Sequence, residues 1–182
     1  MERRRWQIRA VRKRQDLSTV TNRFAMIQPG AVLAFATVRN EAKRLPYFLK
    51  YYRDLGIDHF LIVDNDSDDG GADLLAGEPD VSLWSTKASY RKSRFGTDWM
   101  NWLKMRYGHG HWTLTVDADE FLLYPYSDTR PLPALCDWLD QSGIRSFGTL
   151  LLDMYPKGAI DEITYEPGQN RFEIAEWVDA GN

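Results

Sequence analysis

Two aspartates, Asp117 and Asp119, stand two residues apart directly after an apolar run that ends at Val116. Carboxylate oxygens are the ligands that Mg²⁺ and Mn²⁺ prefer, and two carboxylates at this spacing can approach one hard cation. Such a cation would bridge them to phosphate oxygens and offset the charge that develops on a leaving diphosphate. The same pattern also occurs in a capped turn with surface acids. The apolar run before the pair, and Glu120-Phe121 after it, favour the metal site.

Two further polar clusters follow apolar runs that are typical of buried strands. Arg39 and Glu41 follow the first run, and Asp64 and Asn65 follow the second. In an open parallel sheet, ligands bind at the carboxyl ends of the strands, so we expect these side chains at one edge with the aspartate pair. Carboxylates crowded at one edge repel one another, and a bound cation would relieve that repulsion.

Each of these clusters also has a purely structural interpretation. The loop at Asp64 and Asn65 is rich in turn formers, which cap a helix or close an Asx turn, but at a strand end either residue could hydrogen-bond a nucleobase edge. Glu41 is a surface acid or the cap of the next helix, and Arg39 pairs with the acidic edge or contacts the ligand. Arg94 lies in a basic loop that is either solvated or contacts a diphosphate, which suits the planar guanidinium.

Apolar patterning predicts the elements that would position these residues. Short apolar runs indicate buried strands, and apolar residues at helical spacing between them indicate helices. Strands that alternate with helices imply an α/β fold of the Rossmann type, with a mainly parallel sheet flanked by helices. The predicted strands are 31–38, 59–63, 81–84, 112–116 and 147–152, and the predicted helices are 45–55, 72–76, 97–107 and 132–141.

Composition and charge exclude several classes of protein. With 182 residues, 43% of them hydrophobic, the chain can build one domain with a real core, and its net charge of -3 does not suggest a nucleic-acid partner. The single cysteine, Cys136, excludes a disulfide framework and a cysteine zinc site, and it favours a reducing, cytoplasmic location. No apolar run reaches the roughly 18–20 residues that cross a bilayer.

The motifs together resemble family 2-type glycosyltransferases of the GT-A fold, in the branch that has an Arg-Asn-Glu opening. The resemblance spans roughly residues 32–157 and rests on the order and spacing of four stretches, which are 37–41, 45–52, 55–67 and 116–121. It implies a nucleotide-diphospho-sugar donor, Mn²⁺ or Mg²⁺ as cofactor, and a hydroxyl of a saccharide or lipid-linked acceptor. It also favours inversion at the anomeric carbon, because no nucleophile is evident.

The resemblance also implies roles for individual residues. It puts Asp64 and Asn65 at the nucleobase, Glu41 in the nucleoside pocket, and Asp117 and Asp119 on the ribose, the metal and the diphosphate. The commoner family pattern has two adjacent aspartates where this chain has an aspartate and an asparagine. We therefore expect its recognition of the base to differ.

The catalytic base of the family usually lies in an acidic motif well beyond the aspartate pair. Our candidate for this base is Asp153, although no acid beyond residue 150 stands in a comparable motif. The other acids in this part of the chain are Asp161, Glu162, Glu173 and Glu176. We therefore expect the acceptor side to be incomplete.

Three regions are predicted along the chain. Residues 1–30 form a basic arm, which is a solvated tail or helix, or an arm that touches a partner or anionic lipid at the inner face of a membrane. Residues 31–157 form the domain that binds the nucleotide sugar. Residues 158–182 are the start of an acceptor-side region or a C-terminal tail.

Two other functions are compatible with these residues. A nucleotidyltransferase shares the fold type and the cation, but it normally has a glycine-rich phosphate loop after the first strand, and residues 37–41 contain no glycine. A non-catalytic module that binds a nucleotide sugar is the second alternative. An incomplete acceptor side would favour this module, and so would a buried Arg or Lys paired to Asp119.

Overall fold

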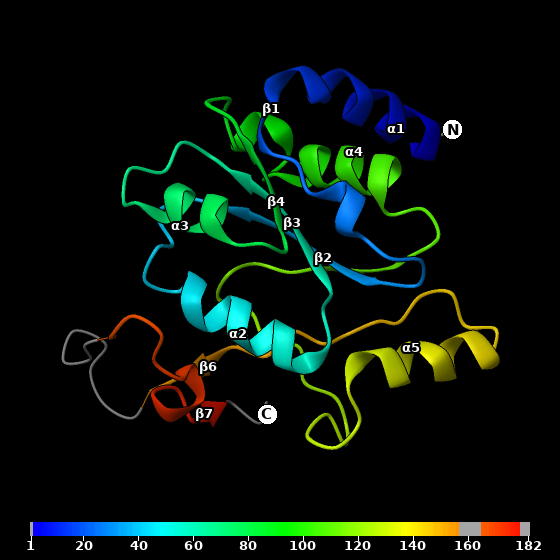
Figure 1. Ribbon diagram of the computed structural model, residues 1–182, viewed down its shortest axis with the longest axis vertical. Helices are drawn as coiled ribbons and strands as arrows, with labels where there is room; N and C mark the ends of the chain where they lie inside the picture. Colours follow the sequence, from blue (N-terminus) through cyan, green and yellow to red (C-terminus); the bar gives the residue numbers. More distant parts are fainter. Residues whose placement is uncertain (1, 157–164, 179–182) are drawn as a thin grey trace.

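A computed structural model describes residues 2–156 and 165–178, which form an α/β fold around one five-stranded sheet (Figure 1). The strand order is β1-β4-β3-β2-β5, with β1 antiparallel to β4 and the other strands parallel to one another. The prediction of a mainly parallel sheet flanked by helices is therefore confirmed. The strands are β1 (Ser18–Thr21), β2 (Val32–Val38), β3 (His59–Asp64), β4 (Val81–Ser85) and β5 (Trp112–Thr115).

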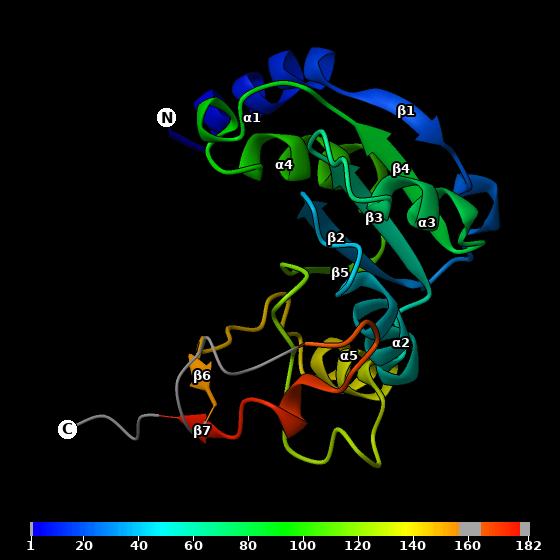
Figure 2. The same cartoon turned by 90° about the vertical axis from the view of Figure 1, so that its left-hand side faces the viewer.

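Helices cover both faces of the sheet because successive side chains of a strand point to opposite faces. Along β2, Ala34 and Ala36 belong to the core shared with α2, α3 and α5, whereas Leu33 and Phe35 belong to the core shared with α4. Helix α1 lies outside α4, at the far side of this second layer (Figure 2). The helices are α1 (Glu2–Lys13), α2 (Leu45–Leu55), α3 (Gly71–Gly77), α4 (Thr97–Tyr107) and α5 (Leu132–Gln141).

The ends of α2 show how local sequence sets an element. Pro46 lies in the first turn, where a missing N–H costs nothing, and Gly56 ends the helix in the left-handed region at φ 105°. The Gly56 N–H donates to the carbonyls of Tyr52 and Arg53. A Cβ on Gly56 would lie 2.5 Å from Cδ of Pro133, so this glycine also permits the close contact between α2 and the first turn of α5.

The predicted strand at 147–152 is wrong. This segment has no strand hydrogen bonds, and Leu150, Leu151 and Leu152 are exposed. An apolar run becomes a strand only when a neighbouring strand accepts its hydrogen bonds, and in the described chain the edge strand β5 pairs with β2 alone. The segment instead leads into β6 (Met154–Tyr155), which pairs with β7 (Trp177–Val178).

The N-terminal region packs against the domain. Arg9 of α1 forms an ion pair with the buried Asp98 of α4 at 2.6 Å, and Ala10 is buried at the same contact. Three short 3-10 helices are η1 (Arg14–Asp16), η2 (Phe24–Met26) and η3 (Arg91–Ser93), and β1 follows η1 to add an antiparallel edge to the sheet. Within the described residues, no helix is long and apolar enough to cross a membrane.

The described part of the C-terminal region packs against the start of α2. The Tyr47 hydroxyl donates to Asn170 Oδ1 at 2.7 Å, and Phe172 contacts the ring of Phe121. Phe172 belongs to a further 3-10 helix, η5 (Arg171–Glu173), which precedes β7 in the chain. The boundary predicted at residue 157 lies outside the described residues.

Buried His59 makes the stability of the sheet dependent on pH. Its Nε2 lies 2.9 Å from Ser82 Oγ, and burial lowers the pKa of the imidazole below its usual value. The folded state therefore keeps His59 neutral. Below a pH of about 6.5 the unfolded chain takes up a proton at this histidine, and the folded state loses stability relative to it. Acidification from neutral pH to a pH of about 5.5 should lower the free energy of unfolding of the wild type. We expect a smaller decrease in His59→Gln, by up to about 1 kcal/mol.

Urea unfolding at the two pH values measures this difference. The exposed His109 supplies the matched control, and His109→Gln should lose as much stability on acidification as the wild type. An equal loss in His59→Gln and His109→Gln would contradict the prediction.

Candidate functional site

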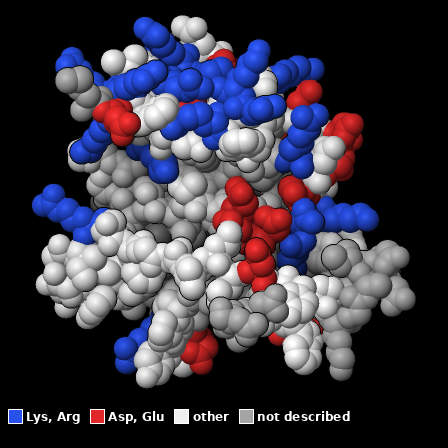
Figure 3. Space-filling model, turned by 180° about the vertical axis from the view of Figure 1, so that it is seen from behind, with Lys and Arg blue, Asp and Glu red and all other residues white. Residues whose placement is uncertain are grey.

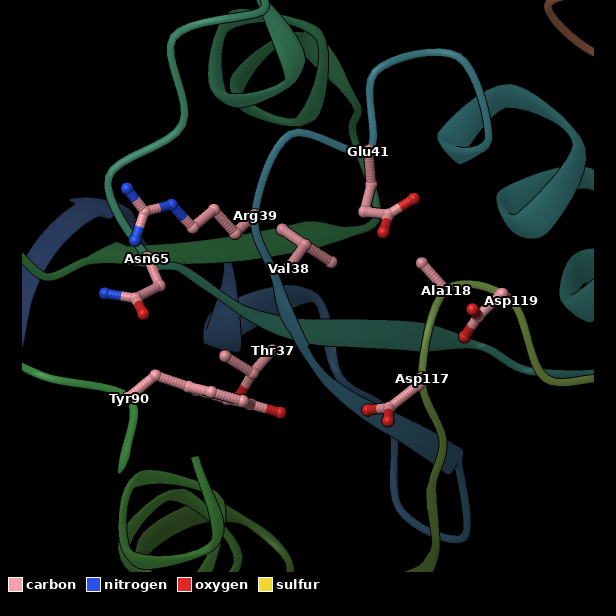
Figure 4. Close-up of a pocket in the computed structure, with 9 residues that line it drawn as sticks. All are labelled: Thr37, Val38, Arg39, Glu41, Asn65, Tyr90, Asp117, Ala118 and Asp119. Atoms are coloured by element: carbon pink, nitrogen blue, oxygen red, sulfur yellow. The ribbon is translucent and has the colours of Figure 1, made fainter. Parts of the chain in front are cut away.

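A pocket of about 370 Å³ opens at the carboxyl edge of the parallel strands (Figure 4). Its walls come from the end of β2, the loop after β3, the loop between β4 and α4, and the loop after β5. The lining residues are Thr37, Val38, Arg39, Glu41, Asn65, Tyr90, Asp117, Ala118 and Asp119.

The parallel register brings these distant segments together. Val38 at the end of β2 pairs with Asp64 at the end of β3, and the Asn65 N–H donates to the Val38 carbonyl at 2.8 Å. On the other side of β2, the Val116 N–H donates to the Phe35 carbonyl at 3.1 Å. The polar residues that follow all three strands therefore lie around one opening, as the sequence predicts.

Negative charge is concentrated on one side of the pocket. Figure 4 shows the carboxylates of Glu41, Asp117 and Asp119 on this side. Desolvation raises the pKa of Asp117, and the charges of Glu120, Asp119 and Glu41 raise it further, although Asp117 as a whole is exposed and solvent screens part of this repulsion. In the described chain no Arg or Lys forms an ion pair with Asp117 or Asp119, whereas Glu41 is held by Arg44 at 2.6 Å.

The chemistry of this acidic side fits a hard divalent cation. Asp117 and Asp119 present carboxylate oxygens, which suit Mg²⁺ or Mn²⁺. The described residues contain no group of three or more His, Cys, Asp or Glu side chains arranged to hold a metal ion. Oxygens of a bound phosphate, and water, would therefore have to complete the coordination, as is usual for Mg²⁺.

The loop after β3 has a structural role as well as a place at the pocket. Asn65 lines the pocket, and its Nδ2 donates to the carbonyls of Thr86 at 3.0 Å and Ala88 at 3.1 Å, which fixes the loop after β4. The Oδ1 of Asn65 is then the atom that can accept a hydrogen bond from a ligand. Asp64 is buried behind the pocket wall, where its Oδ2 accepts from the Ser67 N–H at 3.2 Å and its Oδ1 has no partner.

The two predicted arginines lie in different places. Arg39 is exposed and lines the pocket. Arg94 does not line it, because its Nε donates to Asp98 Oδ1 at 2.9 Å and its guanidinium lies 4.0 Å from the centre of the Trp6 ring. The side chain predicted to contact a diphosphate instead joins α1 to α4.

The structure does not bring the predicted catalytic base to the pocket. Asp153 is exposed just before β6 and is not among the lining residues. Glu173 and Glu176 are exposed as well, and Asp161 and Glu162 lie outside the described residues. Within the described ranges, no acidic residue that follows Asp119 in the sequence lines the pocket.

Four lining residues are absent from the sequence-based prediction, and two of them, Thr37 and Tyr90, bring polar side-chain atoms to the pocket. Thr37 is the last residue but one of β2, and its Oγ1 is buried without a hydrogen-bond partner. Burial, together with the charges of Asp117 and Asp119, raises the pKa of Tyr90, and its hydroxyl points across the pocket toward Asp117 (Figure 4). Thr37 stands two residues before the Arg-Asn-Glu motif, and this position could have indicated it, whereas Tyr90 lies in a loop that has no periodic pattern.

Gly96 permits the close approach of these two side chains. Its φ is +75°, and a Cβ there would lie 2.7 Å from Thr37 Oγ1 and 3.1 Å from Tyr90 Cε2. Gly110 has a similar φ of +82° but has open space around the corresponding position. Both alanine substitutions add backbone strain of roughly 1 kcal/mol, and only Gly96→Ala also forces pocket side chains apart, at an additional cost of about 1–3 kcal/mol.

Thermal unfolding of both variants tests this contact. We expect the midpoint of Gly96→Ala to fall below that of Gly110→Ala by at least roughly 2 °C, which corresponds to about 1 kcal/mol for a chain of this size. Equal midpoints would show that Thr37 and Tyr90 are not packed against Gly96.

Comparisons with protein-family models, with curated proteins and with solved structures find no match for this chain. The fold and the site alone therefore define its class. It is an α/β protein whose mainly parallel sheet carries, at its carboxyl edge, a pocket lined by carboxylates.

Proposed function

We propose that this chain is the donor-binding domain of a divalent-metal-dependent glycosyltransferase with the GT-A type of fold. It moves a sugar from a nucleoside diphosphate to an acceptor hydroxyl. The observation that carries the proposal is the convergence of most of the predicted donor-site and metal residues on one pocket. These residues are Arg39, Glu41, Asn65, Asp117 and Asp119.

The layout of the pocket suits the parts of such a donor. Its volume of about 370 Å³ falls within the usual range for ligand sites. Asn65 Oδ1 and the ring of Tyr90 can meet the nucleobase by hydrogen bonding and by stacking, and Asp117 and Asp119 hold the cation that neutralises the diphosphate. When bound, the cation supplies charge stabilisation for the leaving diphosphate. Arg39 adds a donor for anionic oxygens.

The buried Oδ1 of Asp64, which has no hydrogen-bond partner, supports a bound donor group or water near the end of β3. A buried acceptor without a partner costs roughly 1–3 kcal/mol, and a donor group of the ligand or an ordered water would satisfy it. Thr37 Oγ1 is likewise buried without a partner. Thr37 and Asp64 stand near the carboxyl ends of β2 and β3, the edge at which the pocket opens.

Two observations weigh against the other functions. Residues 37–41 contain no glycine, so the backbone cradle of a nucleotidyltransferase is missing after β2. The absence of an Arg or Lys ion pair with Asp117 or Asp119 in the described chain argues against a module whose cation has been replaced by a basic side chain.

A thermal-shift screen tests the proposal. The wild-type protein is heated with nucleoside diphosphate sugars of each common base, with and without Mn²⁺. We expect one base to raise the midpoint only when Mn²⁺ is present, because the cation must join the diphosphate to the aspartates. The corresponding nucleoside monophosphate serves as the control, since it lacks the diphosphate that two carboxylates and a cation recognise.

Two outcomes would contradict parts of this proposal. If no nucleoside diphosphate sugar stabilises the chain in a metal-dependent way, the donor site is wrong. If a donor binds but release of the nucleoside diphosphate is not detected with any sugar or lipid-linked acceptor, the binding-module alternative holds.

A further inference from the structure

The outward side of α1 is a basic surface interrupted by apolar side chains. Residues 1–15 hold seven of the 23 basic residues of the chain but only one of its 26 acidic residues, although the whole chain is acidic. Figure 3 shows Lys and Arg side chains gathered over the end of the molecule that α1 and α4 form.

The inner side of α1 is fixed to the domain by specific contacts. Arg9 donates to Asp98 and, through Nη2, to the Lys92 carbonyl at 2.7 Å. Trp6 lies under the guanidinium of Arg94, and Ala10 is fully buried. Because these contacts set the rotation of the helix, they also determine which residues remain exposed.

The exposed side combines arginines with two aliphatic residues. Arg4, Ile8 and Arg12 are four residues apart and therefore align along one side of the helix, with Val11 beside Ile8. Ile8 is 48% exposed and Val11 is 36% exposed, whereas Ala10, on the opposite side of α1, is fully buried against the domain. Within the described residues, no acidic partner accompanies Arg4 or Arg12, nor the nearby Arg3 and Arg5.

We propose that α1 lies flat on an anionic lipid surface, with Arg4 and Arg12 at the headgroups and Ile8 and Val11 at the boundary of the acyl chains. Arginines flanking aliphatic residues on one helical side are the pattern of an interfacial helix, in which charge attracts the lipid and apolar burial holds it. A nucleic acid would contact the arginines but would gain nothing from Ile8 and Val11. The exposed η3 residues Arg91 and Lys92 add positive charge next to α1, to which Arg9 ties the Lys92 carbonyl.

Co-sedimentation with vesicles tests this surface independently of the proposed function, because it needs no donor and no metal. The full chain is mixed with vesicles of phosphatidylglycerol and phosphatidylcholine, or of phosphatidylcholine alone. We expect binding only to the anionic vesicles, and we expect it to weaken as salt is raised.

Two variants separate the charged and the apolar contributions. Arg4→Glu/Arg12→Glu should weaken binding at least about tenfold, since each basic residue near an anionic surface contributes measurably. Ile8→Gln/Val11→Gln keeps every charge and should still weaken binding several-fold. Lys50→Glu/Arg130→Glu makes the same change of charge on exposed residues of another face and should bind as the wild type does.

The result that overturns the proposal is equally specific. Unchanged binding in Ile8→Gln/Val11→Gln, together with binding of duplex nucleic acid by the same arginines, would assign the surface to nucleic acid. Absence of binding to anionic vesicles by the wild type would exclude the lipid. Unfolding midpoints of all three variants show whether α1 remains docked, and equal midpoints are expected because none of these side chains contacts Asp98.

Discussion

Asp117→Asn/Asp119→Asn should lose the metal-dependent stabilisation by a nucleoside diphosphate sugar while folding at least as well as the wild type. Both effects have one cause, which is the crowding of carboxylates at the carboxyl edge of the sheet. Without a cation, desolvation and the charges of Glu120, Asp119 and Glu41 oppose ionisation of Asp117, and uncharged amides avoid both costs. With a cation, the same amides no longer supply anionic ligands.

The two effects are large enough to separate in one experiment. A ligand at about 100 times its Kd adds about 2.7 kcal/mol, which raises the midpoint of a chain of this size by roughly 5–10 °C. We expect this increase in the wild type with Mn²⁺ and none in the variant. Asp137→Asn/Asp140→Asn on α5 removes the same charge away from the pocket and should keep the wild-type increase.

The pH dependence gives a second check on the same variant. Because the pKa of Asp117 is raised in the folded state, the repulsion is present above that pKa and disappears once the carboxyl is protonated. The advantage of the variant without metal should therefore be seen near neutral pH and vanish in acid. A variant that is less stable than the wild type at neutral pH would contradict this account.

Asp98→Ala should cause the largest loss of stability among single substitutions of charged residues. Asp98 is fully buried in the first turn of α4, between Arg9 at 2.6 Å and Arg94 at 2.9 Å. Removing one partner of a buried ion pair is strongly destabilising, and we expect a loss of roughly 3 kcal/mol, at the low end of the usual range because both guanidiniums reach solvent. Urea unfolding measures it.

The exposed pair formed by Lys50 and Asp54 provides the matched control. It also joins a basic residue to a helical aspartate four positions away, but both side chains are mostly exposed. Asp54→Ala should therefore change the free energy of unfolding by no more than about 0.5 kcal/mol. Similar losses in the two variants would show that burial of Asp98 does not strengthen its ion pairs.

Asp98→Ala should also weaken binding of the donor at the pocket. Arg94 and Phe95 have positive φ values of 54° and 55°, so the loop that carries Tyr90 is held in an unfavourable backbone conformation. Asp98 anchors Arg94 directly, and through Arg9 it holds the Lys92 carbonyl. We expect donor affinity to fall several-fold at temperatures where Asp98→Ala is still folded, whereas Asp54→Ala should bind as the wild type does.

The sequence by itself determined the strands and helices that carry the pocket, because their signals are local. Apolar runs mark β2, β3, β4 and β5, and helical spacing with Pro46 and Gly56 marks α2. The sequence also assigns the polar residues just after these strands to one edge, because parallel strands share their carboxyl edge. For this reason Asp117 and Asp119 line the same pocket as Asn65.

Only the tertiary structure decided which loop residues reach the pocket. Tyr90 and Arg94 are four positions apart in the same loop, yet Tyr90 lines the pocket and Arg94 is held by Asp98 and Trp6. Tertiary pairing likewise decided that 147–152 is not a strand and that 18–21 is one. A loop conformation and an edge pairing depend on partners distant in the chain, and local periodicity carries no information about those partners.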